Sequence, residues 1–144
     1  MNGWVLRIGI IVLIVAGGFV LRDRLSSNAG DLKVGDCFDD PRGASEITDV
    51  QHHPCSEAHN AEVVFLGKLT GDAYPSDATV ETWVRSNCLP VWETYTGKTY
   101  ETEPILALGF YQPTTDGWGK GDRDVICYAM REDSAPMTGS VRKQ

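Results

Sequence analysis

Four cysteines in a chain of 144 residues are the feature that most limits what this sequence can fold into. They are Cys37, Cys55, Cys88 and Cys127, and all of them follow an apolar N-terminal segment. No two form a C-x-x-C pair, which argues against a thioredoxin-like redox motif and against a zinc ribbon. An even number of spaced cysteines behind an export-like segment predicts two disulfides and an oxidising compartment.

The apolar segment runs from Trp4 to Leu21 with one charged residue, Arg7. As a helix it would extend roughly 27 Å, about the thickness of a bilayer core. We expect residues 1–25 to be a transmembrane anchor, with a cleaved signal peptide as the main alternative. Basic residues lie on both sides of the span, so the positive-inside rule does not decide the orientation of the span. We therefore take the orientation from the cysteines, whose predicted disulfides place the domain in an oxidising compartment. This predicts a single-pass membrane protein with a cytoplasmic N-terminus and an extracytoplasmic domain.

The rest of the chain has the length and composition of one domain. Residues 26–31 form a short polar linker, 32–133 the exported domain, and 134–144 a C-terminal strand or tail. The exported part has ten basic and nineteen acidic side chains, a net charge of −9, against −7 for the whole chain. Such an acidic domain is not expected to bind nucleic acid, because phosphate recognition needs a basic patch.

Hydrophobic patterns predict an α+β domain. Strands are expected over residues 61–69, 105–111 and 125–130, a weaker one over 47–51, and an extended entry over 32–38. Ser76 should cap a helix from Asp77 to about Leu89, which Pro90 would break or kink before a further helical turn over 91–95. We predict an antiparallel sheet of about four or five strands with one main packed helix.

Residues 113–122 then form a glycine-rich connection. Gly117, Gly119 and Gly121 are expected to supply the positive φ angles that a tight loop needs.

Four cysteines allow three pairings. Cys88 falls on the buried face of the predicted helix and Cys127 in the last strong strand, while Cys37 and Cys55 flank the other half. This favours Cys37–Cys55 and Cys88–Cys127. On the chain-entropy model these loops would contribute roughly 3 and 4 kcal/mol.

Three short motifs stand out in the chain: V-G-D-C-F at residues 34–38, C-S-E-A-H-N-A-E-V at 55–63, and W-G-K-G-D-R-D-V-I-C at 118–127. They resemble V-G-D-C-F/Y, C-x-x-P-H-x-x-E-V and W-x-x-G-D-R-x-x-x-C, which are motifs of the septum-formation domain family of actinobacteria. Ala58 stands where the family usually has proline. The resemblance spans about residues 32–131 and implies an exported or membrane-anchored domain linked to septum formation or envelope growth.

The histidines are the first candidates for chemistry. His52, His53, Cys55 and His59 lie within eight residues and include zinc-binding types. Cys55 is better assigned to a disulfide, and adjacent histidines in an extended segment point to opposite faces. We therefore predict no metal and no cofactor, and we expect His59 to hydrogen-bond a turn backbone before the strand at Ala61.

The second candidates lie near the last strand. Asp122 and Arg123 form either a ligand-binding charge pair or a local ion pair that fixes the turn. Trp118 either covers the edge of the core or is an exposed contact residue. With His59 they are the weak candidates for a binding site.

The sequence favours a protein that is not an enzyme, since it contains no G-x-S-x-G and no H-E-x-x-H. The leading hypothesis is a non-catalytic, membrane-anchored extracytoplasmic interaction domain of the cell envelope that binds an envelope or division protein. One alternative is an accessory subunit of a larger membrane protein complex. Another is a small cell-wall or metal-dependent hydrolase.

Overall fold

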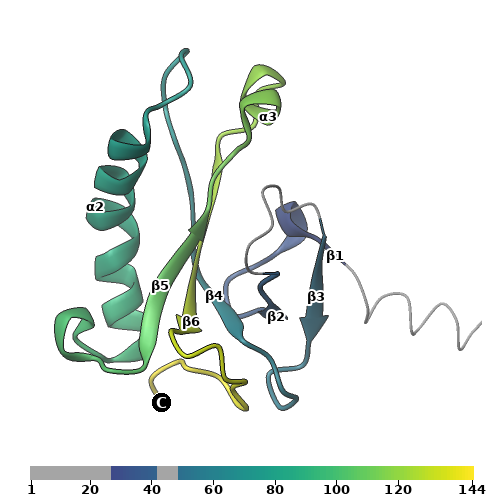
Figure 1. Ribbon diagram of the computed structural model, residues 1–144, viewed down its shortest axis with the longest axis vertical. Coiled ribbons are helices and arrows are strands. Elements are labelled where there is room, and N and C mark those ends of the chain that lie inside the picture. The colour runs from purple at the N-terminus through teal and green to yellow at the C-terminus, as the bar shows by residue number, and fades with distance from the viewer. Residues whose placement is uncertain (1–26, 42–48) are drawn as a thin grey trace, which may run out of the picture.

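The computed structural model describes residues 27–41 and 49–144 (Figure 1). The predicted anchor lies outside the described residues, as do 42–48 and with them the first part of the weak strand expected over 47–51. No helix in the described ranges is long and apolar enough to cross a membrane.

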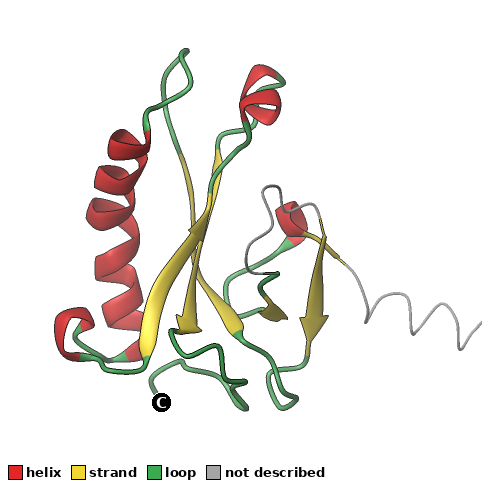
Figure 2. Cartoon of the chain, viewed as in Figure 1, coloured by secondary structure: helices red, strands yellow, loops and turns green. Residues whose placement is uncertain are grey.

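Six strands form one antiparallel sheet in the order β1-β3-β2-β4-β6-β5. They are β1 (Ser27–Asn28), β2 (Cys37–Asp39), β3 (Asp49–His53), β4 (Ala61–Lys68), β5 (Leu106–Tyr111) and β6 (Asp124–Arg131). The two-residue β1 extends the sheet by pairing with β3. Figure 2 shows a single long helix beside the central strands. The predicted α+β fold, a small antiparallel sheet with one main helix and two disulfides, is confirmed.

The main helix is α2 (Asp77–Thr96). Ser76 caps it as predicted, since its hydroxyl accepts a hydrogen bond of 3.3 Å from the Thr79 amide. Helical spacing then gathers the buried side chains on one face, at Val80, Val84, Cys88, Trp92, Tyr95 and Thr96. The helix ends at Gly97, whose φ of 68° suits a left-handed cap.

Of the two outcomes expected at Pro90, a break or a kink, the break was wrong, because α2 continues through Pro90 to Thr96. Proline removes the hydrogen bond to the carbonyl four residues earlier, that of Ser86. Both residues are exposed, so solvent can hydrate that carbonyl. On the opposite face Cys88 and Trp92 are fully buried and hold the helix against the sheet on either side of the proline.

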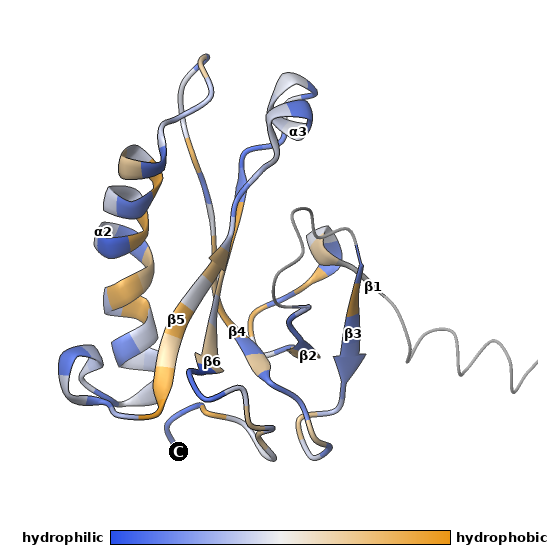
Figure 3. Cartoon of the chain, in the orientation of Figure 1, coloured by the Kyte–Doolittle hydropathy of each residue, from blue (hydrophilic) through white to orange (hydrophobic). Residues whose placement is uncertain are grey.

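Side chains alternate along β6 between two hydrophobic clusters. Val125, Cys127 and Ala129 pack against α2. Ile126 and Tyr128 point to the other side, where a second cluster includes Phe38 and Val63. Figure 3 shows hydrophobic stretches in β5 and on parts of α2, with hydrophilic residues on other parts of the helix. Both faces of the central sheet are therefore buried.

Two disulfides tie elements of the domain together. Cys88–Cys127 joins α2 to β6, and its cysteines belong to the first cluster. Cys37–Cys55 joins β2 to the turn after β3. These are the two pairings expected from the sequence.

The connection over 113–122 contains a short helix, α3 (Thr115–Gly119). Gly121 has the predicted positive φ, 96°, but Gly117 and Gly119 do not, because both lie within α3.

Two regions expected to flank the domain also carry structure. Within the predicted linker, residues 27–31 form β1 and the 3-10 helix η1 (Ala29–Asp31), in which Ala29 is buried. Past β6, Met137 bridges to His59, and the following residues lie along the domain. A second 3-10 helix, η2 (Tyr100–Thr102), follows α2.

Candidate functional site

The V-G-D-C motif forms the turn that leads into β2. The Asp36 amide donates to the Lys33 carbonyl at 3.0 Å, and Gly35 has a φ of 94° at the third turn position, where glycine is favoured. Two backbone hydrogen bonds join the turn to Val63 of β4. The Gly35 amide donates to the Val63 carbonyl at 2.8 Å, and the Val63 amide donates to the Asp36 carbonyl at 2.9 Å. The motif therefore fixes where Cys37 enters the sheet.

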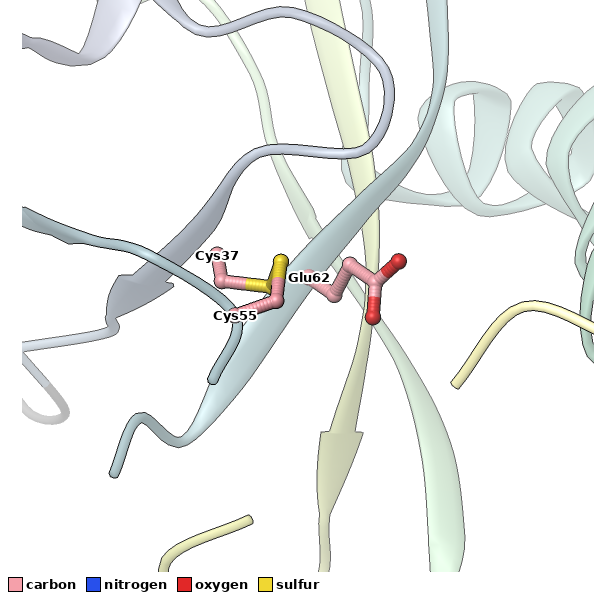
Figure 4. A group of neighbouring side chains, drawn as sticks. All are labelled: Cys37, Cys55 and Glu62. Carbon is pink, nitrogen blue, oxygen red and sulfur yellow. A yellow bond between two sulfur atoms is a disulfide. The ribbon is translucent and has the colours of Figure 1, made fainter. Parts of the chain in front are cut away.

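The Cys37–Cys55 disulfide lies beside Glu62 of β4 (Figure 4). The two sulfur atoms and one carboxylate oxygen are within 4.8 Å of one another, a spacing that would suit a metal ion. A metal binds thiolates, however, and both sulfurs are bonded to each other. The donor set therefore does not fit a metal while the disulfide is intact.

Glu62 is the most buried carboxylate of the site, with no exposed surface. Its Oε1 accepts hydrogen bonds from the Tyr95 hydroxyl at 2.6 Å and the Ser140 hydroxyl at 2.7 Å. Its Oε2 accepts one from the Val141 amide at 2.7 Å. One carboxylate thus joins β4, α2 and the C-terminal segment.

Burial raises the pKa of Tyr95 to about 12, and the hydrogen bond to Glu62 acts in the same direction. Arg142 lies over the Tyr95 ring, with its guanidinium carbon 5.1 Å from the ring centre. Lys143 donates its amide to the Tyr95 carbonyl at 2.8 Å. The C-terminal segment is therefore attached to α2 at several points.

His59 is buried and hydrogen-bonds a turn backbone, as predicted. Its Nδ1 lies 2.8 Å from the Glu57 carbonyl, so Nδ1 carries the proton. Its backbone exchanges two hydrogen bonds with Met137, at 3.0 and 2.6 Å. Its Nε2 is buried and has no hydrogen-bond partner within the described ranges. These contacts give His59 a structural role in holding the C-terminal segment.

His52 and His53 line an open depression of about 350 Å³ beside the Cys37–Cys55 disulfide. They face different carboxylates, His52 Nε2 lying 3.4 Å from Asp36 and His53 Nε2 2.9 Å from Asp39. Each imidazole is thus paired with its own acid at the surface, and the two do not converge with His59 on one point.

Trp118 and Arg123 pack together at α3. The Trp118 ring is buried, and its Nε1 donates to the Asp72 carbonyl at 3.0 Å. The Arg123 guanidinium stacks on that ring at 3.6 Å and donates to the Trp118 carbonyl at 2.8 Å. Trp118 therefore covers a core edge.

Asp122 acts on the turn itself. Its carboxylate accepts the Asp124 amide at 2.9 Å, directly after the positive φ of Gly121. The turn and Arg123 together lock α3 to the start of β6.

The four weak candidates therefore fall into two groups. His59 is bridged to the C-terminal segment, whereas Trp118, Asp122 and Arg123 surround α3, which Figure 1 places at the other end of the sheet. The sequence did not single out the role of Glu62. Its signals were its match to the E of the motif C-x-x-P-H-x-x-E-V and its place near the start of a largely apolar strand.

Comparisons with known proteins agree with the motifs. A family model described as "Septum formation" matches residues 34–144. The chain is 30% identical over 117 residues to "Putative lipoprotein LppN" of Mycobacterium tuberculosis and to the protein of the same name in Mycobacterium bovis. The match covers 78% of this chain but 63% of those proteins, so the chain spans less than two thirds of these relatives. No solved structure matches it.

Proposed function

Because the chain belongs to the septum-formation family, we propose that it is a non-catalytic extracytoplasmic interaction domain of the cell envelope, held at the membrane by its N-terminal segment. It would bind another envelope or division protein near the site of septum formation. Attachment to the membrane raises its local concentration there, so a weak contact would be enough.

The observation that carries this proposal is that all four cysteines form disulfides. Disulfides persist in oxidising compartments and are rare in the reducing cytosol. They support a domain that folds and works outside the membrane. A relative named as a lipoprotein fits the same location.

The proposed anchor is the apolar segment within residues 1–25. A lipid on one of the four cysteines would require breaking a disulfide that joins two parts of the domain. The apolar segment needs no such change, and its predicted length of roughly 27 Å suits a bilayer core.

The contacts of the motif residues support a binding rather than a catalytic role. His59 and Glu62 hold the C-terminal segment, and Arg123 covers the buried Trp118 ring. These side chains are used in packing and hydrogen bonding within the domain, which makes the motifs the scaffold of the fold.

Cross-linking on intact cells tests the proposal. The Lys68 and Lys120 side chains are 75% and 74% exposed, so a membrane-impermeant, amine-reactive cross-linker can reach them if the domain is outside. We expect mass spectrometry to identify envelope or division proteins joined to the full chain. Cross-links that form only after the membrane is opened, and only to cytosolic proteins, would contradict the proposal.

A further inference from the structure

Among the strands that the structure describes, β5 forms one edge of the sheet. It is the last strand in the order, and it pairs with β6 in a regular register from Leu106↔Arg131 to Tyr111↔Ile126. The Glu132 amide donates to the Ile105 carbonyl at 3.1 Å, which marks that pair as a hydrogen-bonded one. Hydrogen-bonded pairs alternate along an antiparallel ladder, so the backbone groups of Leu106, Leu108 and Phe110 point outward.

These outward groups are available to a further strand. The Leu106 amide already has a partner, the Glu103 carboxylate at 3.4 Å. The outward groups of Leu108 and Phe110 face no described strand. Open edges are usually blunted by charged residues or proline. Residues 106–111 read L-A-L-G-F-Y and contain neither.

The side chains of Leu108 and Phe110 lie on the face of the sheet that packs on α2. Between this edge and the helix is a groove of about 360 Å³, whose apolar lining includes Val84, Leu89 and Tyr100. Figure 1 shows β5 running alongside α2. The outward backbone groups of Leu108 and Phe110, which face no strand in the described ranges, therefore border an apolar groove.

The rim of the groove is charged and has an acidic excess. Glu81 and Arg85 stand one turn apart on α2, and Glu101 comes from η2, beyond the other end of the helix. All three residues are exposed.

We propose that β5 and this groove bind an extended segment of a partner protein, which joins the sheet beside β5 as an additional strand. Alternate side chains of the segment would be apolar and enter the groove, and a lysine or arginine on the same face of the segment would meet Glu81 or Glu101. Main-chain hydrogen bonds supply affinity in strand addition, while side-chain pockets and charges supply specificity. The inference rests on the proposed interaction function and names the class of partner.

A second copy of the chain is a poorer occupant. If two β5 edges paired with each other, the strand entering the groove would be residues 106–111, which contain no basic side chain. The carboxylates of Glu81 and Glu101 would then gain no partner from it. Charge complementarity therefore favours a basic segment of another protein.

Peptide binding tests the inference with the full chain in lipid nanodiscs. The probe is a nine-residue peptide with lysine at positions 1 and 9, valine at positions 3, 5 and 7 and threonine at the even positions, so that lysines and valines lie on one face of the strand. We expect saturable binding that is lost when alternate backbone amides are N-methylated, because these can no longer pair with β5, and that weakens when glutamate replaces lysine. Equal binding of all three peptides would overturn the proposal.

Three variants locate the binding. Leu108→Pro removes an outward amide, a position where an edge strand tolerates proline, and should abolish binding, while Leu108→Val keeps the amide and should bind. If the proline variant does not fold, Glu81→Arg tests whether the groove is the binding site. It should weaken the lysine peptide about fivefold and strengthen the glutamate peptide. Asp31→Arg makes the same charge change in η1, near the opposite edge of the sheet, and should leave both affinities unchanged. Equal effects of the two arginine variants would refute the groove as the site.

The failures of the two proposals are distinguishable. Envelope partners that cross-link equally well to wild type and Glu81→Arg on intact cells would sustain the interaction function and overturn the groove. Binding of the lysine peptide in nanodiscs, without any envelope partner in cells, would support the groove and contradict the proposed function.

Discussion

Replacing Glu62 by glutamine should loosen the C-terminal segment without removing it. The glutamine carbonyl can still accept from Tyr95 and Ser140, which share one carboxylate oxygen. The glutamine amide nitrogen then faces the Val141 N–H, and since both groups are donors no hydrogen bond can form between them. The variant therefore loses one hydrogen bond to a charged acceptor and gains none.

A hydrogen bond to a charged group contributes about 1.5–3 kcal/mol. Val141 is half-buried, so we take the lower part of this range and expect a loss of about 2 kcal/mol. For a domain of this size that corresponds to a decrease of roughly 7 °C in Tm.

Calorimetry of the oxidised full chain measures the loss, and hydrogen exchange at the Val141 amide locates it. Exchange there should be faster in Glu62→Gln. Tyr95→Phe is the matched control, because it removes a different donor to Glu62 and leaves the Val141 hydrogen bond in place. It should also cost about 2 kcal/mol, because it too removes a hydrogen bond to the charged carboxylate, but without faster exchange at Val141. A Glu62→Gln variant with unchanged Tm and unchanged Val141 exchange would refute the role assigned to the carboxylate.

Three further perturbations test other parts of the structure. Replacing both Cys88 and Cys127 by alanine should lower the unfolding free energy by about 4 kcal/mol in denaturant titrations, and an unchanged midpoint would contradict the bracing role of that disulfide. Pro90→Ala restores an amide to an exposed position inside α2 and should stabilise the protein by about 1–3 kcal/mol, whereas destabilisation would argue against a continuous helix. The raised pKa of Tyr95, about 12 in the fold against 10 unfolded, means that its contribution is complete below pH 10 and is lost as the pH rises through 12. Circular dichroism should follow this alkaline loss, and a Tyr95→Phe variant with an equally steep loss would contradict it.

Local patterns were enough to predict the fold class and the disulfides. Ser76 followed by helical spacing located the start of α2, and the same spacing put Cys88 on the buried face. Cys127 stands in a strand whose interior is largely apolar, so a helix-to-sheet disulfide followed from positions along the chain. Such signals depend on near neighbours in sequence.

The course of α2 past Pro90 was not predictable in this way. A proline inside a helical pattern usually ends the helix, because it removes one hydrogen bond and crowds the preceding turn. Here the burial of Cys88 and Trp92 on both sides outweighs that local preference. Burial depends on the tertiary structure, which a pattern of residue types does not contain.

The role of Glu62 and the open edge at β5 were also beyond the sequence. The donors to Glu62 are 33, 78 and 79 residues away along the chain. Whether β5 is an edge depends on a strand order in which β6 inserts between β4 and β5. Both features arise from contacts between distant segments, and short motifs do not encode them.

The thiol count of the protein in living cells tests the central claim most directly. Cells are quenched in acid, and the denatured full chain is labelled with a heavy maleimide before and after reduction. An extracytoplasmic domain with both disulfides formed predicts no labelled cysteine before reduction and four after it. Four labelled cysteines before reduction would mean that the domain resides in a reducing compartment, and would contradict the account.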